Sequence, residues 1–171
     1  MKALSIMIGS LVTVLCAQTQ CQEYHQEILH KAVNWAVEDG AGGYALDRER
    51  MWVDLEVPSS TPTEVVEKLQ QVAALLDLPT THHTQSAAWR ACSSDPHSED
   101  CLGVAGASFV TAFGLERTSE TEAVVTTRVI MLDPSPRQGR MGWTVISGAA
   151  LKLEKADQGW VVVDVLTRIV S

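Results

Sequence analysis

Four β-rich runs in the C-terminal part of the chain decide the fold: SFVTAFGL (108–115), AVVTTRVIML (123–132), MGWTVISGAALKL (141–153) and WVVVDVLTRIV (160–170). Short links rich in Gly, Pro, Ser and Asp join each run to the next. Links of this length between strands require antiparallel neighbours. The sequence therefore predicts a four-stranded β-meander.

The second and third runs each have an apolar face and a partly polar face. In the second run Val125, Val129 and Met131 fall on one face, whereas Thr126 and Arg128 fall on the other. In the third run the apolar face carries Met141, Trp143, Val145, Ala149, Leu151 and Leu153. One apolar face and one partly polar face are typical of an antiparallel sheet that is covered on a single side.

The chain before the meander has helical periodicity. Residues 24–37 and 62–76 repeat apolar side chains at helical spacing, which predicts two amphipathic helices, and residues 51–57 alternate as a strand does. Residues 77–106 predict a long, irregular connection with a short helix near 85–91. This order predicts an α+β fold in which N-terminal helices pack on a mostly antiparallel, curved sheet.

The last run begins with Gly159-Trp160-Val161-Val162-Val163. With the helices-then-strands order of residues 24–170, this segment resembles the cone-shaped cystatin-like folds, including the nuclear-transport-factor-2-like domains. The resemblance concerns the fold alone. It implies N-terminal helices packed against a strongly curved sheet, and it transfers no functional residue.

The N-terminus has the pattern of a secretory signal. Lys2 precedes an apolar stretch that ends near Leu15, and Ala17 is a small residue at the expected cleavage point. We therefore expect residues 1–17 to be a signal peptide, residues 18–171 to form one domain, and the protein to be periplasmic or secreted. An N-terminal membrane anchor, or a lipid on Cys16 or Cys21, is the alternative.

Charge limits the partners. The chain carries a formal charge of −8, and a phosphate backbone is bound through clustered Lys and Arg. We therefore expect no nucleic-acid partner. After signal cleavage no stretch reaches membrane-spanning length without a charge, so we expect no membrane span. The partner that remains is a small molecule or a protein, and the chain itself is a monomer or a homodimer.

Two cysteines enclose a polar, turn-prone octapeptide. Cys92 and Cys101 would close a small disulfide loop in an oxidising compartment, which agrees with export. Two free thiols are the alternative. Cys21 is then the odd thiol of the processed chain.

Catalytic and metal chemistry have no clear residue pattern. His25 and His30 are five residues apart, which turns them away from each other on a helix. His82, His83 and His97 could converge on zinc, but the disulfide would consume the nearby thiolates and adjacent histidines rarely aim at one point. We therefore expect no catalytic residue, no metal and no cofactor.

Four polar residues on the strands are the candidate ligand contacts: Thr126, Arg128, Asp164 and Arg168. If the sheet curves into a pocket, a charged side chain inside it would anchor a small polar ligand. Alternatively this face is simply exposed to solvent, or its Arg and Asp side chains pair across strands.

Three functional hypotheses follow. The leading one is a non-catalytic, exported binding or interaction module, so we lean against an enzyme. The second is a cone-shaped domain that binds or converts a small molecule in a polar pocket, with Arg128 or a histidine at its floor. The third is an envelope-associated structural dimer that uses an uncovered face of the sheet.

Overall fold

The computed structural model describes residues 25–39, 45–134 and 144–171 of the chain. The expected signal peptide, residues 1–17, lies outside the described residues. So do Cys21, Tyr24, Met141 and Trp143, and with them the expected start of the third β-run.

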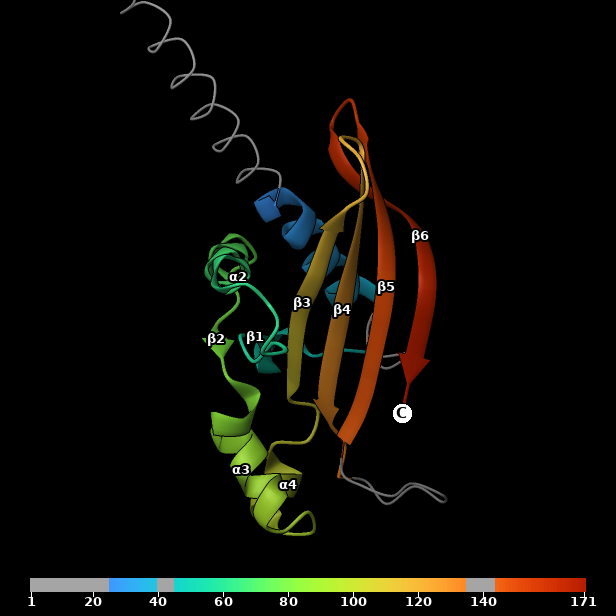
Figure 1. Ribbon diagram of the computed structural model, residues 1–171. Coiled ribbons are helices and arrows are strands. Elements are labelled where there is room, and N and C mark those ends of the chain that lie inside the picture. The colour runs from blue at the N-terminus through green and yellow to red at the C-terminus, as the bar shows by residue number, and fades with distance from the viewer. Residues whose placement is uncertain (1–24, 40–44, 135–143) are drawn as a thin grey trace, which may run out of the picture.

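Six strands form one mixed sheet in the order β2-β1-β3-β4-β5-β6 (Figure 1). The four strands of the expected meander are confirmed, and each is antiparallel to the next: β3 (Ser108–Arg117), β4 (Glu122–Leu132), β5 (Thr144–Ala156) and β6 (Gly159–Val170). The sheet is larger than this meander, because two short strands lie parallel to one another and to β3 at its edge: β1 (Met51–Asp54) and β2 (Thr80–Thr81).

The parallel pairing follows from the connections. Helix α2 (Thr63–Leu75) links β1 to β2, and helices α3 (Ala87–Ser94) and α4 (Glu99–Gly103) link β2 to β3. A connection that contains a helix can return the chain to the same end of the sheet, as parallel strands require. The expected irregular connection, residues 77–106, is thus largely helical.

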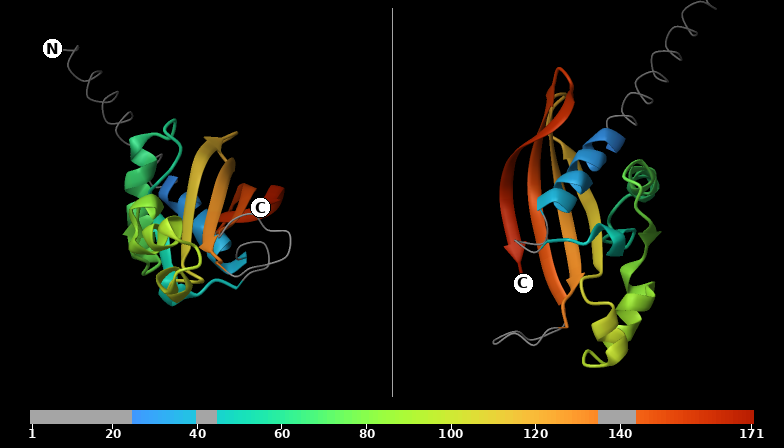
Figure 2. Two further views of the ribbon diagram at one scale, coloured as in Figure 1. Left: turned by 90° about the horizontal axis from the view of Figure 1, so that it is seen from below. Right: turned by 180° about the vertical axis from the view of Figure 1, so that it is seen from behind.

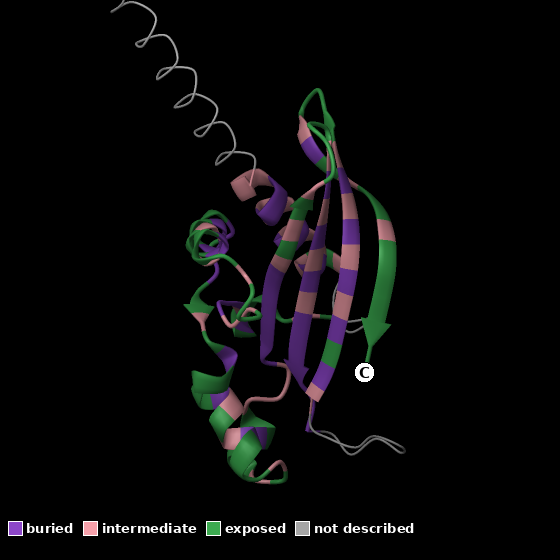
Figure 3. Cartoon of the chain, in the orientation of Figure 1, coloured by how far each residue is buried: buried purple, intermediate pink, exposed green. Residues whose placement is uncertain are grey.

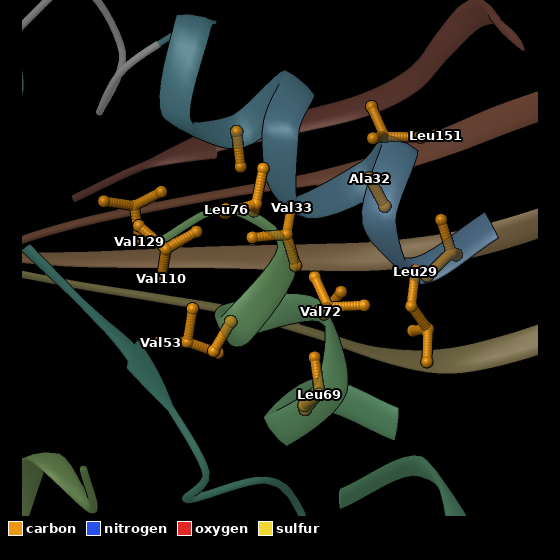
Figure 4. Packing of buried hydrophobic residues seen from close by; sticks show 14 of the residues in the cluster. Leu29, Ala32, Val33, Val53, Leu69, Val72, Leu76, Val110, Val129 and Leu151 are labelled. Carbon is orange, nitrogen blue, oxygen red and sulfur yellow. The ribbon is translucent and has the colours of Figure 1, made fainter. Parts of the chain in front are cut away.

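The main core lies between the sheet and two helices. The helix over residues 25–39 crosses one face of the long strands, and α2 stands beside it (Figure 2). Side chains of both helices point toward strand residues (Figure 4). The helices contribute Leu29, Ala32, Val33, Leu69 and Val72, and the strands contribute Val53, Val110, Val129 and Leu151. All are buried, and full burial of one such Val or Leu contributes about 1.5–3 kcal/mol.

A second apolar cluster covers part of the opposite face of the sheet. Phe109 on β3 and Ile130 on β4 alternate with the core residues Val110 and Val129, so they face away from the helix over residues 25–39. They pack with Cys92 and Cys101 of α3 and α4. The expectation of a sheet covered on a single side is therefore wrong near β3, because α3 and α4 supply a second cover.

The disulfide between Cys92 and Cys101 is present and belongs to this cluster. Both cysteines are fully buried, and Trp89 packs against the same cluster. The bridge ties α3 to α4, which holds the second cover together against the sheet.

Candidate functional site

A buried carboxylate ends the short strand β1. Asp54 has an exposed fraction of 0%, and its Oδ1 accepts hydrogen bonds from the backbone N–H groups of Glu56 at 3.0 Å and His83 at 3.1 Å. Its Oδ2 lies 2.8 Å from His83 Nδ1 and 3.3 Å from Arg128 Nη2. Asp54 is therefore the centre of a polar cluster, because a buried charge is tolerated only when it is paired and hydrogen-bonded.

His83 begins the short 3-10 turn that follows β2. Its side chain is 9% exposed, and its ring packs edge-on against Trp89 with the ring centroids 4.7 Å apart. The ring centroid of Phe109 lies 6.0 Å from that of His83. These aromatic contacts fix the imidazole so that Nδ1 faces Asp54.

Glu56 completes the acidic side of the cluster. Its Oε2 lies 3.3 Å from His83 Nδ1 and accepts hydrogen bonds from the hydroxyl of Thr84 at 2.7 Å and its backbone N–H at 3.2 Å. Burial alone would raise the pKa of Glu56. The bonds from Thr84, helped by His83 and His82, outweigh it and hold the pKa below its ordinary value of 4.5. Glu56 is therefore ionised at neutral pH.

Arg128 brings the positive charge. Its Nη2 contacts Asp54 and donates to the backbone carbonyl of Glu56, and its guanidinium lies over the ring of Phe113 at 5.7 Å. Its Nε is buried without a hydrogen-bond partner among the described residues. With Asp54, Glu56 and His83 it forms what we call the Asp54 cluster.

The expected ligand contacts do not form one group. Thr126 and Arg128 do share a face of β4, the same face to which β1 contributes Asp54. Asp164 pairs with Lys152 on that face, two strands away, and its carboxylate accepts from the N–H of Val165. Arg168 lies on the opposite face.

On that opposite face Arg168 binds Asp39 of the helix over residues 25–39. Its two terminal nitrogens lie 2.9 Å from the two carboxylate oxygens, and its guanidinium lies 5.4 Å from the ring centroid of Trp35. It therefore joins helix to sheet and stands apart from the Asp54 cluster.

The sequence did not predict that Asp54, Glu56 and His83 come together. Within the described ranges, Asp54, Glu56 and His83 are the one set of His, Cys, Asp or Glu residues that could share a metal ion. The histidine grouping that the sequence suggests differs, since His82 and His97 are exposed and take no part. The one sequence signal for this group was that two acidic residues, Asp54 and Glu56, alternate with apolar residues in the predicted strand over residues 51–57.

A separate cleft opens between the two helices of the main core. It encloses about 390 Å³ between the helix over residues 25–39, the segment after β1, α2 and β3. We call it the helix cleft. Its apolar walls come from all four segments: Leu29, Pro58, Pro62, Val65, Phe113 and Leu115.

Three ionisable side chains stand among these walls. Glu64 Oε1 lies 3.8 Å from His25 Nδ1, and both residues line the cleft together with Lys68. Lys68 Nζ has a contact of 3.3 Å with Gln71 and no ion pair among the described residues. A cavity with apolar walls and a few polar groups is the usual form of a small-molecule site.

Comparisons with protein-family models, curated proteins and solved structures returned no match. Among the described residues no helix is both long and apolar enough to cross a membrane.

Proposed function

We propose that the protein is a non-catalytic binding module that holds a small, mainly apolar molecule in the helix cleft. The observation that carries this proposal is the cleft itself, with its volume of about 390 Å³ and its lining from two helices and the sheet. Pockets for small molecules measure about 300–1,000 Å³ and are lined mostly by apolar side chains. The helix cleft meets both criteria.

The ligand that fits this lining carries one anionic group. Among the residues that the structure describes, Lys68 is the cleft cation without an acidic partner, whereas His25 is matched by Glu64. A carboxylate on an otherwise apolar ligand would pair with Lys68 and leave its chain against Leu29, Val65 and Leu115. The chemical class is therefore a medium-chain fatty acid or a molecule of similar polarity.

We further propose that the protein works after export, in an oxidising compartment. The disulfide between Cys92 and Cys101 supports this location, because such bridges persist outside the reducing cytosol. A ligand-binding module in the periplasm or in the secreted fraction agrees with it.

Ligand binding can be measured with 8-anilinonaphthalene-1-sulfonate, a fluorescent apolar anion, and with decanoate as competitor. We expect the dye to bind the folded protein and decanoate to displace it. Leu115→Trp fills the cleft and should weaken binding about tenfold or more, which corresponds to about 1.4 kcal/mol. Leu102→Trp is the matched control, because Leu102 is 52% exposed on α4.

Lys68 gives a separate test of the anionic group. Lys68→Met should weaken decanoate binding about two- to fivefold, the effect of an exposed ion pair, and leave decanol binding unchanged. Equal dye binding by the wild type and Leu115→Trp, with no displacement by decanoate, would overturn the proposal.

A second candidate function, self-association, is favoured by the edge strand β6. Most of its length is exposed (Figure 3), and five of its exposed residues are large and apolar: Val161, Val163, Leu166, Ile169 and Val170. An exposed strand edge pairs readily with another strand. The charges of Asp164 and Arg168 cancel, so β6 carries no net charge although the whole chain has a formal charge of −8. Two copies of the chain can therefore approach along β6 with little electrostatic repulsion. The partner we propose is therefore a second copy of this chain.

Sedimentation velocity distinguishes this candidate from ligand binding alone. We expect a dimer for the wild type and a monomer for Ile169→Lys, because a lysine would have to be buried at the interface. Leu75→Lys on α2 is the matched control, since Leu75 and Ile169 are 63% and 62% exposed. A wild type that sediments as a monomer at high concentration contradicts self-association and leaves ligand binding to its own test.

A further inference from the structure

We propose that Asp54, Glu56 and His83 form a binding site for a divalent cation of the zinc or manganese type. This site lies apart from the helix cleft and does not depend on the ligand proposed for it. Two carboxylates and one imidazole, completed by water, form a donor set that zinc and manganese both accept.

The three donor atoms already lie near coordination geometry. His83 Nδ1 lies 2.8 Å from Asp54 Oδ2 and 3.3 Å from Glu56 Oε2, and all three atoms lie within 4.8 Å of one another. Ligands bound to one zinc ion at about 2.0–2.2 Å stand about 3–3.5 Å from each other. Two of the three separations are therefore close to the spacing that one ion imposes, and the carboxylates of Asp54 and Glu56 stand no more than 4.8 Å apart.

Two of the three donors are held by further hydrogen bonds, as metal ligands usually are, and the third is held by ring contacts. Two backbone N–H groups bind Asp54 Oδ1 and turn Oδ2 toward His83. Thr84 holds Glu56 through its hydroxyl and its N–H. Trp89 and Phe109 fix the ring of His83. The site is thus preorganised before any ion binds.

Arg128 does not exclude the cation. Its contact with Asp54 Oδ2, at 3.3 Å, is long, and it also donates to the carbonyl of Glu56. A carboxylate oxygen has two lone pairs, so Oδ2 can bind an ion with one and keep Arg128 on the other. The cation takes the lone pair of Nδ1 on the neutral imidazole, whose one proton is then carried by Nε2.

Two buried polar atoms, one on Arg128 of the cluster and one on the neighbouring Thr111, are a second observation that favours a missing polar ligand. Thr111 lies opposite Arg128 in the β3–β4 register, next to β1 and on the face of Asp54. Its exposed fraction is 0%, and neither its hydroxyl nor Arg128 Nε has a hydrogen-bond partner among the described residues. Such groups are rare in folded proteins, and an ion with its water is one explanation.

Isothermal titration calorimetry with Zn²⁺ and with Mn²⁺ on the metal-free protein tests the site. We expect one cation per chain, and we expect Glu56→Gln to weaken binding about 100-fold or more. Glu56 is 37% exposed, so this near-isosteric change should fold. His82→Gln is the matched control, because His82 is the exposed neighbour of His83 and lies outside the cluster.

X-ray absorption at the zinc edge identifies the ligands directly. The proposed site predicts one imidazole and several oxygen ligands, with no sulfur. The proposal would be overturned by any of three results: the wild type binds no cation, Glu56→Gln binds it as tightly as the wild type, or His82→Gln does not bind it.

Discussion

The carboxylate of Glu27, on the first described helix, accepts a hydrogen bond of 2.9 Å from the backbone N–H of Trp160 at the start of β6. The contact spans 133 residues of sequence and joins the helix to the β5–β6 turn. Trp160 is fully buried in the main core. This bond therefore holds the helix across the sheet at the end of the molecule where the helix cleft opens.

Gly159→Ala should break this junction. Gly159 has a φ of +106°, which favours glycine, and an added Cβ would collide with the carboxylate of Glu27. We expect a loss of about 1–3 kcal/mol from the backbone conformation, with a further loss from the displaced carboxylate. Urea unfolding gives the values. In a Glu27→Ala background the same change should cost less, and strictly additive losses would contradict a direct contact.

Removal of the disulfide should destabilise the second cover of the sheet. The bridge closes a loop with a sequence separation of 9, and the chain-entropy relation for such a loop gives about 2–3 kcal/mol. Cys92→Ala with Cys101→Ala should lower the free energy of unfolding by this amount. The fluorescence of Trp89, which packs on the same cluster, should change with it. Unfolding at the wild-type urea midpoint would show that the bridge adds nothing.

The two Arg–Asp pairs should differ in their contribution to stability. Arg128→Met removes the guanidinium that contacts the buried carboxylate of Asp54, and we expect a loss of about 3 kcal/mol. Arg168→Met breaks the pair with Asp39. The side chain of Arg168 is 42% exposed and that of Asp39 is 25% exposed, so this change should cost about 1 kcal/mol or less. Thermal unfolding of both variants checks the order, and equal losses would mean that burial of Asp54 does not matter.

Stability should fall in mild acid because of His30. Burial, reinforced by Lys31 and opposed by Glu27, lowers the pKa of His30 below its ordinary value of 6.5. Between that lowered pKa and 6.5 the unfolded chain therefore binds more protons than the folded one, so stability decreases as the pH falls through this window. His30→Gln should remove this part of the slope in urea titrations at several pH values. His82→Gln, an exposed control, should leave it in place.

The sequence predicted the long strands well because each is a β-rich run between turn signals, and in β4 and β5 buried and partly exposed residues also alternate. It missed β2, since two residues carry no periodicity, and it missed that β1 joins β3 in parallel. The pairing of β1 depends on tertiary packing of α2, which local pattern does not encode.

The candidate site shows the same division. Arg128 could be found, because a lone arginine in an alternating strand marks the polar face. Asp164 and Arg168 are four residues apart and should share a face, yet one register shift of β6 between them puts them on opposite faces. His83 meets Asp54 across 29 residues of sequence, a contact made by β1 and β2 lying side by side.

The proposed function requires the helix cleft to bind a small apolar anion. A titration of ¹⁵N-labelled protein with decanoate, followed by amide chemical shifts, tests it most directly. We expect saturable shifts that gather at four residues of the cleft lining, Leu29, Val65, Lys68 and Leu115. Shifts confined to β6, or no shift at millimolar decanoate, would contradict it.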